Sequence, residues 1–181
     1  IGVRLGSAFG AVLMLMAAMI AVGIWELSQI ADAKAEMKAT AYKQQLAADW
    51  LRGTATNAVR TFAKVKSSSA EDELYFDGEM KKASAGITLI QKELEALISS
   101  DEGKRRFADV GAKRKVYVGI RDAAFKLKHD PANTPEDLAA MVNTKLVPAM
   151  TAYTESIAQV AAYQKALFDK ADASIDEVYA R

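Results

Sequence analysis

The sequence has 181 residues, and its 24 Lys and Arg nearly cancel its 23 Asp and Glu. It has no cysteine and one histidine, which excludes disulfide scaffolds, cysteine-based metal sites and cysteine nucleophiles. The balanced charge also argues against nucleic-acid binding, which needs a surplus of positive charge on one surface. The composition is rich in Ala, Leu, Lys and Glu, and no segment alternates as a strand does, so we predict an all-α chain.

The first predicted element is a transmembrane helix at residues 5–25, a run without any charged residue. About 20 apolar residues suffice to cross the hydrocarbon core of a bilayer. Arg4 indicates that residues 1–4 are cytoplasmic, and Trp25 suits the membrane interface. A cleaved signal peptide is the alternative, but the apolar run passes directly into a helical pattern. We therefore expect a protein of the bacterial inner membrane, with residues 26–181 in the periplasm.

The rest of the chain predicts an antiparallel up-down-up-down four-helix bundle. Serine-rich breaks end the first two helices, and Ser69 and Ser99-Ser100 can cap the helices that follow. Thr134-Pro135 is typical of a helix start. Pro148 is expected to kink or divide the last helix. The helices are predicted at about 26–67, 70–98, 101–128 and 135–181.

The first of these helices has a seven-residue repeat of mostly small residues, which predicts a packed seam. The seam residues are Leu27, Ile30, Lys34, Met37, Ala41, Gln44, Ala48, Leu51, Ala55, Ala58, Phe62 and Val65. In the last predicted helix, no cap or turn signal closes the helix before Arg181. We therefore expect a second membrane segment and a cytoplasmic output module to follow.

Over essentially its whole length the chain resembles the four-helix-bundle sensor domain of methyl-accepting chemotaxis proteins. The resemblance rests on RLGSAFGAVLMLMAAMIAVGIW, TATNAVRTFAKV and LVPAMTAYTESIAQVAAYQ. It implies a transmembrane receptor, a homodimer or higher oligomer, that binds a ligand outside the cell. It also implies contact with cytoplasmic signalling proteins through the output module, so that the signal directs chemotaxis.

Two motifs bear on the ligand. The NAVR segment at residues 57–60 resembles a segment that supplies ligand-binding arginines in aspartate and serine receptors, which implies a role for Arg60. The other arginines of those receptors are replaced here, so an amino acid held in the same way is not expected. Arg114, Tyr117 and Arg121 match an Arg-x-x-Tyr-x-x-x-Arg pattern of receptors for citric-acid-cycle acids. That match implies citrate, malate or a similar carboxylate as the ligand.

Helix geometry supports an anion site independently of the resemblance. The Arg114, Tyr117 and Arg121 side chains share one helix face, and hydroxyl-bearing and basic residues form similar stripes on the first two helices. Guanidinium groups bind carboxylate oxygens bidentately, and hydroxyl groups can complete the site. The predicted ligand-binding residues are Arg60, Ser84, Thr88, Arg114, Tyr117 and Arg121, with Arg52 and Thr56 as further candidates.

Other functions are less compatible with the sequence. No catalytic constellation, phosphate-binding loop or metal-ligand cluster is recognisable, so we expect neither enzyme activity nor a cofactor or metal. The same sensor could instead serve a histidine kinase or a cyclase. A ligand-free coiled coil that tethers a membrane protein is the structural alternative, and it predicts that Arg60, Arg114 and Arg121 face water.

Overall fold

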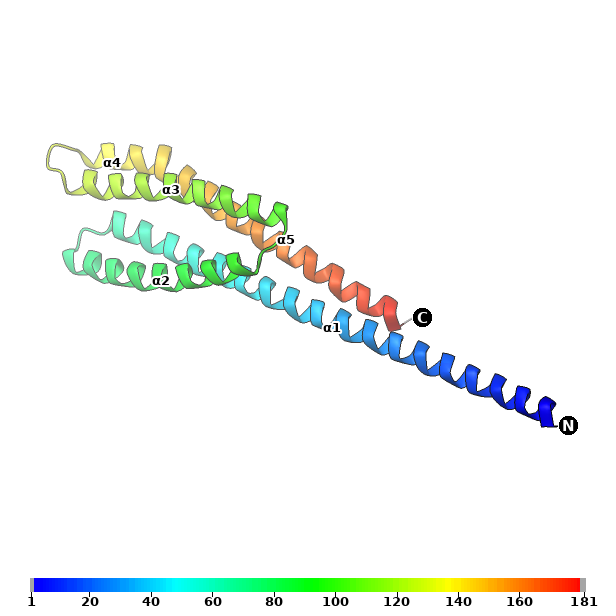
Figure 1. Cartoon of the computed structure of the whole chain (residues 1–181). Coiled ribbons are helices and arrows are strands. Elements are labelled where there is room, and N and C mark those ends of the chain that lie inside the picture. Colours follow the sequence, from blue (N-terminus) through cyan, green and yellow to red (C-terminus); the bar gives the residue numbers. More distant parts are fainter. Residues whose placement is uncertain (1, 180–181) are drawn as a thin grey trace. The chain divides into compact units, whose positions relative to one another are not determined.

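The computed structural model describes the backbone of residues 2–179 and the side chains of residues 9–177. Ile1, the Arg4 side chain and residues 180–181 lie outside this part, and with them parts of the predicted cytoplasmic stub and the last predicted residues of the bundle. The described backbone is helical apart from short turns and contains no strand, which confirms the all-α fold class. The helices are α1 (Gly2–Lys66), α2 (Ala70–Leu97), α3 (Asp101–His129), α4 (Pro135–Met141), the π-helical η1 (Val142–Leu146) and α5 (Val147–Tyr179) (Figure 1).

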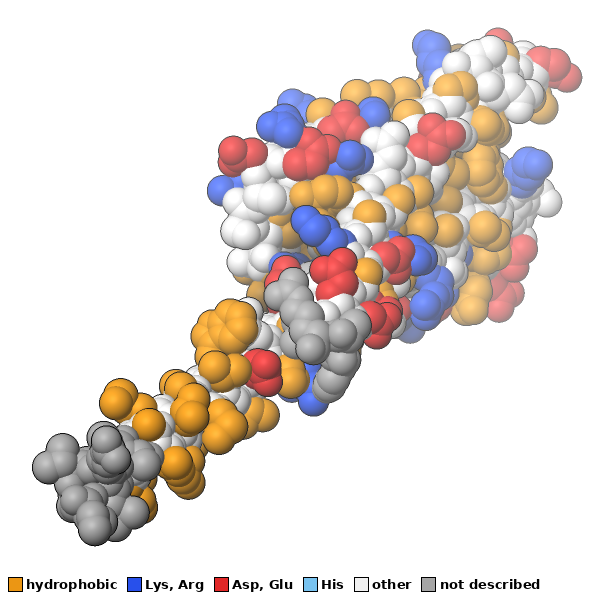
Figure 2. Space-filling view, turned by 90° about the vertical axis from the view of Figure 1, so that its right-hand side faces the viewer, with side chains coloured by type: hydrophobic (Ala, Val, Ile, Leu, Met, Phe, Trp, Pro, Cys, Tyr) orange, Lys and Arg blue, Asp and Glu red, His pale blue; other side chains and the backbone are white. Residues whose placement is uncertain are grey.

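The chain divides into two compact units, one of Ile1–Thr40 with Leu167–Arg181 and one of Ala41–Ala166. In the first unit the apolar part of α1 is uncovered, with Phe9 65% and Trp25 58% exposed (Figure 2). Among the described residues, α1 is the one helix that is long and apolar enough to cross a membrane. A signal sequence meets the same criterion of length and composition. So much exposed apolar surface is typical of a segment that contacts lipid or another apolar partner.

The second unit is the antiparallel bundle, formed by the end of α1, α2, α3, α4, η1 and the first part of α5 (Figure 1). Short turns join successive helices, which makes them antiparallel neighbours. Trp50, Leu94, Val110, Leu146 and Ile157 are fully buried at its centre. Burying an apolar side chain of this size stabilises the fold by about 1.5–3 kcal/mol, so these residues hold the four helices together.

Side-chain caps fix where the helices begin, as predicted. The Ser69 hydroxyl accepts a hydrogen bond from the Asp72 amide, and the Ser100 hydroxyl accepts one from the Gly103 amide. Thr134 and Asp137 form a reciprocal capping box ahead of α4. Gly103 is required by close packing, since a Cβ there would lie 2.5 Å from a methyl carbon of Ile98.

Pro148 interrupts the last helix, as expected. The residues before it form the π-helical segment η1, which ends with the Val147 amide donating to the Val142 carbonyl. Proline has no amide hydrogen and its ring clashes with the preceding turn of a regular α-helix. The wider turn therefore lies next to the proline and separates α4 from α5.

The predicted seam on α1 matches the buried face only in part. Ala55 of that seam is exposed, and Leu51, Ala58 and Phe62 are only partly buried. Val65 of the seam is buried, and the other buried residues on this face include Ala47, Trp50, Thr54 and Thr61, which lie outside the seam. An apolar pattern misses this face because threonine can be buried when its hydroxyl is bonded within its own helix, as the Thr61 hydroxyl is to the Asn57 carbonyl.

Candidate functional site

A small cavity lies between the helices of the Ala41–Ala166 unit. Its volume is about 40 Å³, enough for a few water molecules. None of its lining residues is an Asp or a Glu, whereas two are arginines. The lining comes from α1 (Thr54, Asn57, Ala58), α2 (Ser84, Ile87), α3 (Arg114, Tyr117, Val118, Arg121) and α5 (Met150, Tyr153, Thr154).

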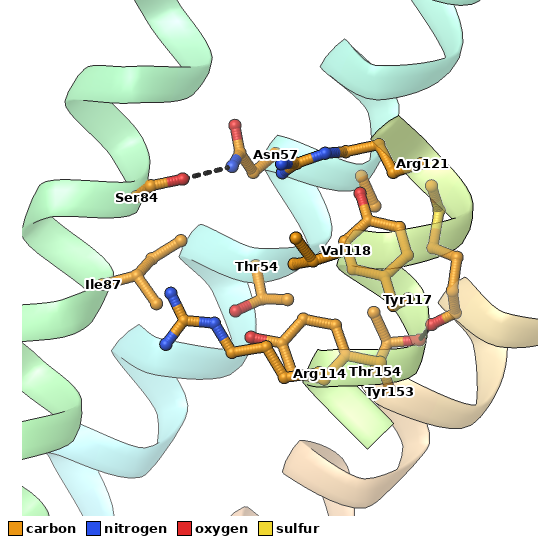
Figure 3. A pocket seen from close by; sticks show the side chains of 12 residues that line it. Thr54, Asn57, Ser84, Ile87, Arg114, Tyr117, Val118, Arg121, Tyr153 and Thr154 are labelled. Atoms are coloured by element: carbon orange, nitrogen blue, oxygen red, sulfur yellow. Dashed lines mark hydrogen bonds between the residues drawn. The ribbon is translucent and has the colours of Figure 1, made fainter. Parts of the chain in front are cut away.

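One face of α3 supplies both positive charges. Arg114, Tyr117 and Arg121 are separated by three and four residues, so their side chains follow one side of the helix. The Tyr117 ring is stacked on Tyr153 of α5, with the ring centroids 5.5 Å apart and the planes inclined by 15°. The two arginine side chains extend on either side of these rings in the same direction (Figure 3). Two guanidinium groups thus border a single space.

The partners of the two arginines differ. An Arg114 guanidinium nitrogen donates to the Gln91 side-chain carbonyl at 3.2 Å, and this neutral partner leaves its positive charge uncompensated. Arg121 donates twice to one carboxylate oxygen of Asp122, at 2.8 and 2.9 Å. The Asp122 side chain is 52% exposed, while that of Arg121 is 21% exposed. Asp122 therefore holds Arg121 from the solvent side.

Neutral polar groups complete the wall. The Asn57 amide nitrogen donates to the Ser84 hydroxyl at 3.2 Å (Figure 3). Thr54 Oγ1 and Asn57 Oδ1 are buried and have no hydrogen-bond partner among the described residues. Leaving such a group unsatisfied costs about 1–3 kcal/mol, so these atoms favour water or a polar ligand in the cavity.

Both tyrosines keep their hydroxyl hydrogens at neutral pH. Burial raises the pKa of Tyr117, while its hydrogen bond with Thr61 and the charge of Arg121 act in the opposite direction. Burial likewise raises the pKa of Tyr153, opposed by the charge of Arg114. The Tyr117 and Thr61 hydroxyls lie 2.9 Å apart. Because the Thr61 hydroxyl donates to the Asn57 carbonyl, the Tyr117 hydroxyl is the donor in this pair. Neither phenol adds negative charge to the site.

The structure brings together half of the eight predicted residues: Ser84, Arg114, Tyr117 and Arg121 line the cavity. Thr88 lies on α2 with its hydroxyl bonded to the Ser84 carbonyl at 2.8 Å. Arg60 lies outside the lining and pairs with Glu79 at 3.1 Å.

The two further candidates also lie outside the lining. The Arg52 side chain is 73% exposed and pairs with Asp49 of the preceding turn. The exposed Thr56 hydroxyl donates to the Arg52 carbonyl at 3.0 Å. Both side chains are therefore engaged within α1, and neither reaches the cavity wall.

Several lining residues were not predicted as ligand-binding residues. Thr54 and Asn57 precede Arg60 by six and three residues on α1, and Tyr153 and Thr154 lie just beyond Pro148 on α5. The adjacent hydroxyl groups of Tyr153 and Thr154 were a usable signal, but which helix faces meet is decided only by packing.

The sequence matches a family model described as "Four helix bundle sensory module for signal transduction" over residues 1–179. A search of curated proteins gives no match. The matched region includes every residue that lines the cavity.

Proposed function

The chain belongs to the family of four-helix-bundle sensory modules for signal transduction, the sensor type of chemoreceptors, and we propose that its ligand is a small organic acid such as citrate or malate. In this proposal the bundle lies in the periplasm, and α1 crosses the inner membrane through its apolar segment. A cytoplasmic output module passes the signal on to direct chemotaxis. The family is a sensory one and not a catalytic one.

One observation supports the organic-acid ligand above all: two arginines and no acid line a cavity between four helices. Each guanidinium group can donate two parallel hydrogen bonds to one carboxylate. Arg114 and Arg121 are separated by two turns of α3, about 10 Å of helix, which suits a ligand with more than one carboxylate. The protonated Tyr153 hydroxyl would donate to a remaining oxygen, and the Tyr117 hydroxyl would do so by exchanging its bond to Thr61 for one to the ligand.

The size of the cavity implies that binding changes the bundle. A di- or tricarboxylate needs more room than about 40 Å³, so the arginines or helices must move outward to admit it. Because the lining comes from α1, α2, α3 and α5, a bound ligand alters how these helices contact one another. Such a ligand shifts the bundle between two states by no more than its difference in affinity for them.

This movement is measurable by spin labels on α1 and α5. Thr56 and Glu155 are exposed and lie outside the cavity, and the chain has no cysteine of its own. The doubly labelled variant, with Thr56→Cys and Glu155→Cys, is diluted with unlabelled chain. We expect the distance distribution between the two labels to change when malate or citrate saturates the protein. A distance that stays constant at saturation contradicts this mechanism.

The proposal is tested by titration calorimetry of the full chain in lipid nanodiscs against citrate, malate, succinate, aspartate and serine. Saturable binding of citrate or malate, with weaker or no binding of serine, is the expected result. No binding of any of the five acids to a helical, folded chain would contradict it. That outcome would favour the ligand-free membrane tether.

Asp122 competes with the ligand for Arg121, so Asp122→Asn is expected to tighten citrate or malate binding. An exposed ion pair is worth about 0.2–1 kcal/mol, which corresponds to a gain in affinity of up to about fivefold. Asp109→Asn is the matched control, since Asp109 also pairs with a basic residue of α3, Lys113, and Lys113 does not line the cavity. Equal affinities of Asp122→Asn and Asp109→Asn would show that Asp122 does not compete.

The homodimer is part of the same proposal. On α1, Val59 is 68% exposed, and Leu51, Ala55 and Phe62 belong to the seam that the bundle leaves partly or fully uncovered. A second copy of α1 would cover these side chains and bury their apolar surface. A histidine kinase or cyclase as the output remains the alternative to a chemotaxis module, and the sensor site would be the same.

A further inference from the structure

A second and larger cavity lies between α2 and α3, near the turn that joins them. Its volume is about 340 Å³, within the range of small-molecule sites. Gln91 and Glu95 of α2 line one side, and Lys104, Phe107 and Gly111 of α3 line the other. None of these residues lines the cavity that contains Arg114 and Arg121.

The floor of this second cavity is apolar and open. Phe107 is buried, and its ring packs against Trp50 with centroids 5.2 Å apart. Ile98 adds a branched aliphatic side chain. Gly111 is exposed and a Cβ there would meet no atom within 4 Å, so the cavity is open to solvent on this side. A hydrocarbon group placed here would contact Phe107 and Ile98 and leave water.

The rim of the cavity has one charge of each sign. Glu95 on α2 and Lys104 on α3 are both exposed. They lie four and five residues from the α2–α3 turn centred on Ser99, hence at similar heights along the two helices. Within the described residues, neither side chain forms an ion pair or hydrogen bond. A ligand with an ammonium and a carboxylate group would find a partner for each charge.

We propose that this cavity binds a small zwitterion with a hydrocarbon part. Its ammonium group pairs with Glu95, its carboxylate pairs with Lys104, and its hydrocarbon part lies over Phe107 and Ile98. The charges could be adjacent, as in an α-amino acid, or at opposite ends, as in an ω-amino acid.

Gln91 connects this site to the anion site. Its side-chain carbonyl accepts the hydrogen bond from Arg114 and also lines the second cavity. An anion that attracts Arg114 frees this carbonyl to accept from the ammonium group of the zwitterion. Each ligand therefore strengthens the binding of the other by the same factor. This coupling rests on the proposed function, whereas the second site itself does not.

The site is tested with the full chain in nanodiscs, using leucine and 6-aminohexanoate as probes. Trp25→Phe leaves Trp50 as the single tryptophan, and its contact with Phe107 makes its fluorescence a reporter of this cavity. We expect a saturable change with at least one zwitterion, and at least tenfold weaker binding of hexanoate and hexylamine. No saturable response to either zwitterion, or equal binding of the singly charged analogues, would overturn the proposal.

Filling the cavity provides the matched pair of variants. Gly111→Leu places a side chain in the open space, while Gly119→Leu does the same on another open stretch of α3 that lines none of the cavities described above. Leucine favours helix more than glycine, so both variants should fold. We expect at least tenfold weaker zwitterion binding in Gly111→Leu only; equal affinities in the two variants would overturn the site.

The coupling between the zwitterion site and the anion site is measured in a separate experiment. Saturating malate should tighten zwitterion binding, and an unchanged affinity, with malate itself bound, would overturn the link through Gln91. The double variant with Arg114→Ala and Arg121→Ala should still bind the zwitterion. Loss of organic-acid binding with retained zwitterion binding would then separate failure of the proposed function from failure of the second site.

Discussion

Replacing both Arg114 and Arg121 by alanine is expected to weaken citrate or malate binding by at least about 100-fold. A hydrogen bond to a charged group contributes about 1.5–3 kcal/mol. The two substitutions in one chain remove every guanidinium donor from the cavity wall. Without them the cavity keeps only neutral donors such as the tyrosine hydroxyls. Titration calorimetry of the full chain in nanodiscs, with the helical circular dichroism signal as a check of folding, measures the loss.

Three controls make this result specific. Arg105→Ala removes an arginine of α3 that pairs with Glu102 outside the cavity, and it should leave the affinity unchanged. Arg60→Ala breaks the pair with Glu79 and should also have little effect. Arg114→Lys keeps the charge but loses the two-pronged donor, so an intermediate loss is expected. Wild-type affinity in the double alanine variant would refute the site.

Lys128→Met is expected to lower the free energy of unfolding by about 2–4 kcal/mol. The Lys128 ammonium donates to the Lys64 carbonyl at 2.5 Å and the Ser67 carbonyl at 2.6 Å, and it pairs with Glu73 at 2.7 Å. All three of its hydrogens are therefore used to join the end of α1 and the start of α2 to α3. Methionine fills similar space but leaves both carbonyls and the Glu73 carboxylate without this partner.

Urea unfolding followed by circular dichroism measures this loss, with Lys126→Met as the control because Lys126 is exposed in the same last turn of α3. Burial alone raises the pKa of Glu73, but Lys128 and then His129 lower it below its ordinary value. The stabilisation is therefore present above the ordinary pKa of a glutamate and is lost as the pH falls. The effect of Lys128→Met should shrink in acid, and equal losses in both variants at neutral pH would contradict the role of Lys128.

The helix boundaries were predictable because their signals are local. The Ser69, Ser100 and Thr134 caps act within four residues of sequence, and the structure confirms all three. The interruption at Pro148 was predictable for the same reason. That it takes the form of a π-helical segment depends on packing, which no local pattern reports.

The site was only partly predictable. The Arg114, Tyr117 and Arg121 stripe follows from spacing on one helix, and the structure places all three in the cavity wall. Which residues of other helices face them depends on how each helix is rotated. The apolar repeat on α1 matches the buried face only in part because that face also contains threonines, and this concealed Thr54. Similarly, the pair between Arg60 and Glu79 joins two helices, and no spacing within one helix indicates it.

A crystal structure of the chain with citrate or malate would test the central claim most directly. We predict one carboxylate group of the ligand within hydrogen-bonding distance of the Arg114 guanidinium group and another within that distance of the Arg121 guanidinium group, with Asp122 released from Arg121. A tyrosine hydroxyl, Tyr117 or Tyr153, should donate to the same ligand. A bound acid located elsewhere, with Arg121 still paired to Asp122 and Arg114 still bonded to Gln91, would contradict the account.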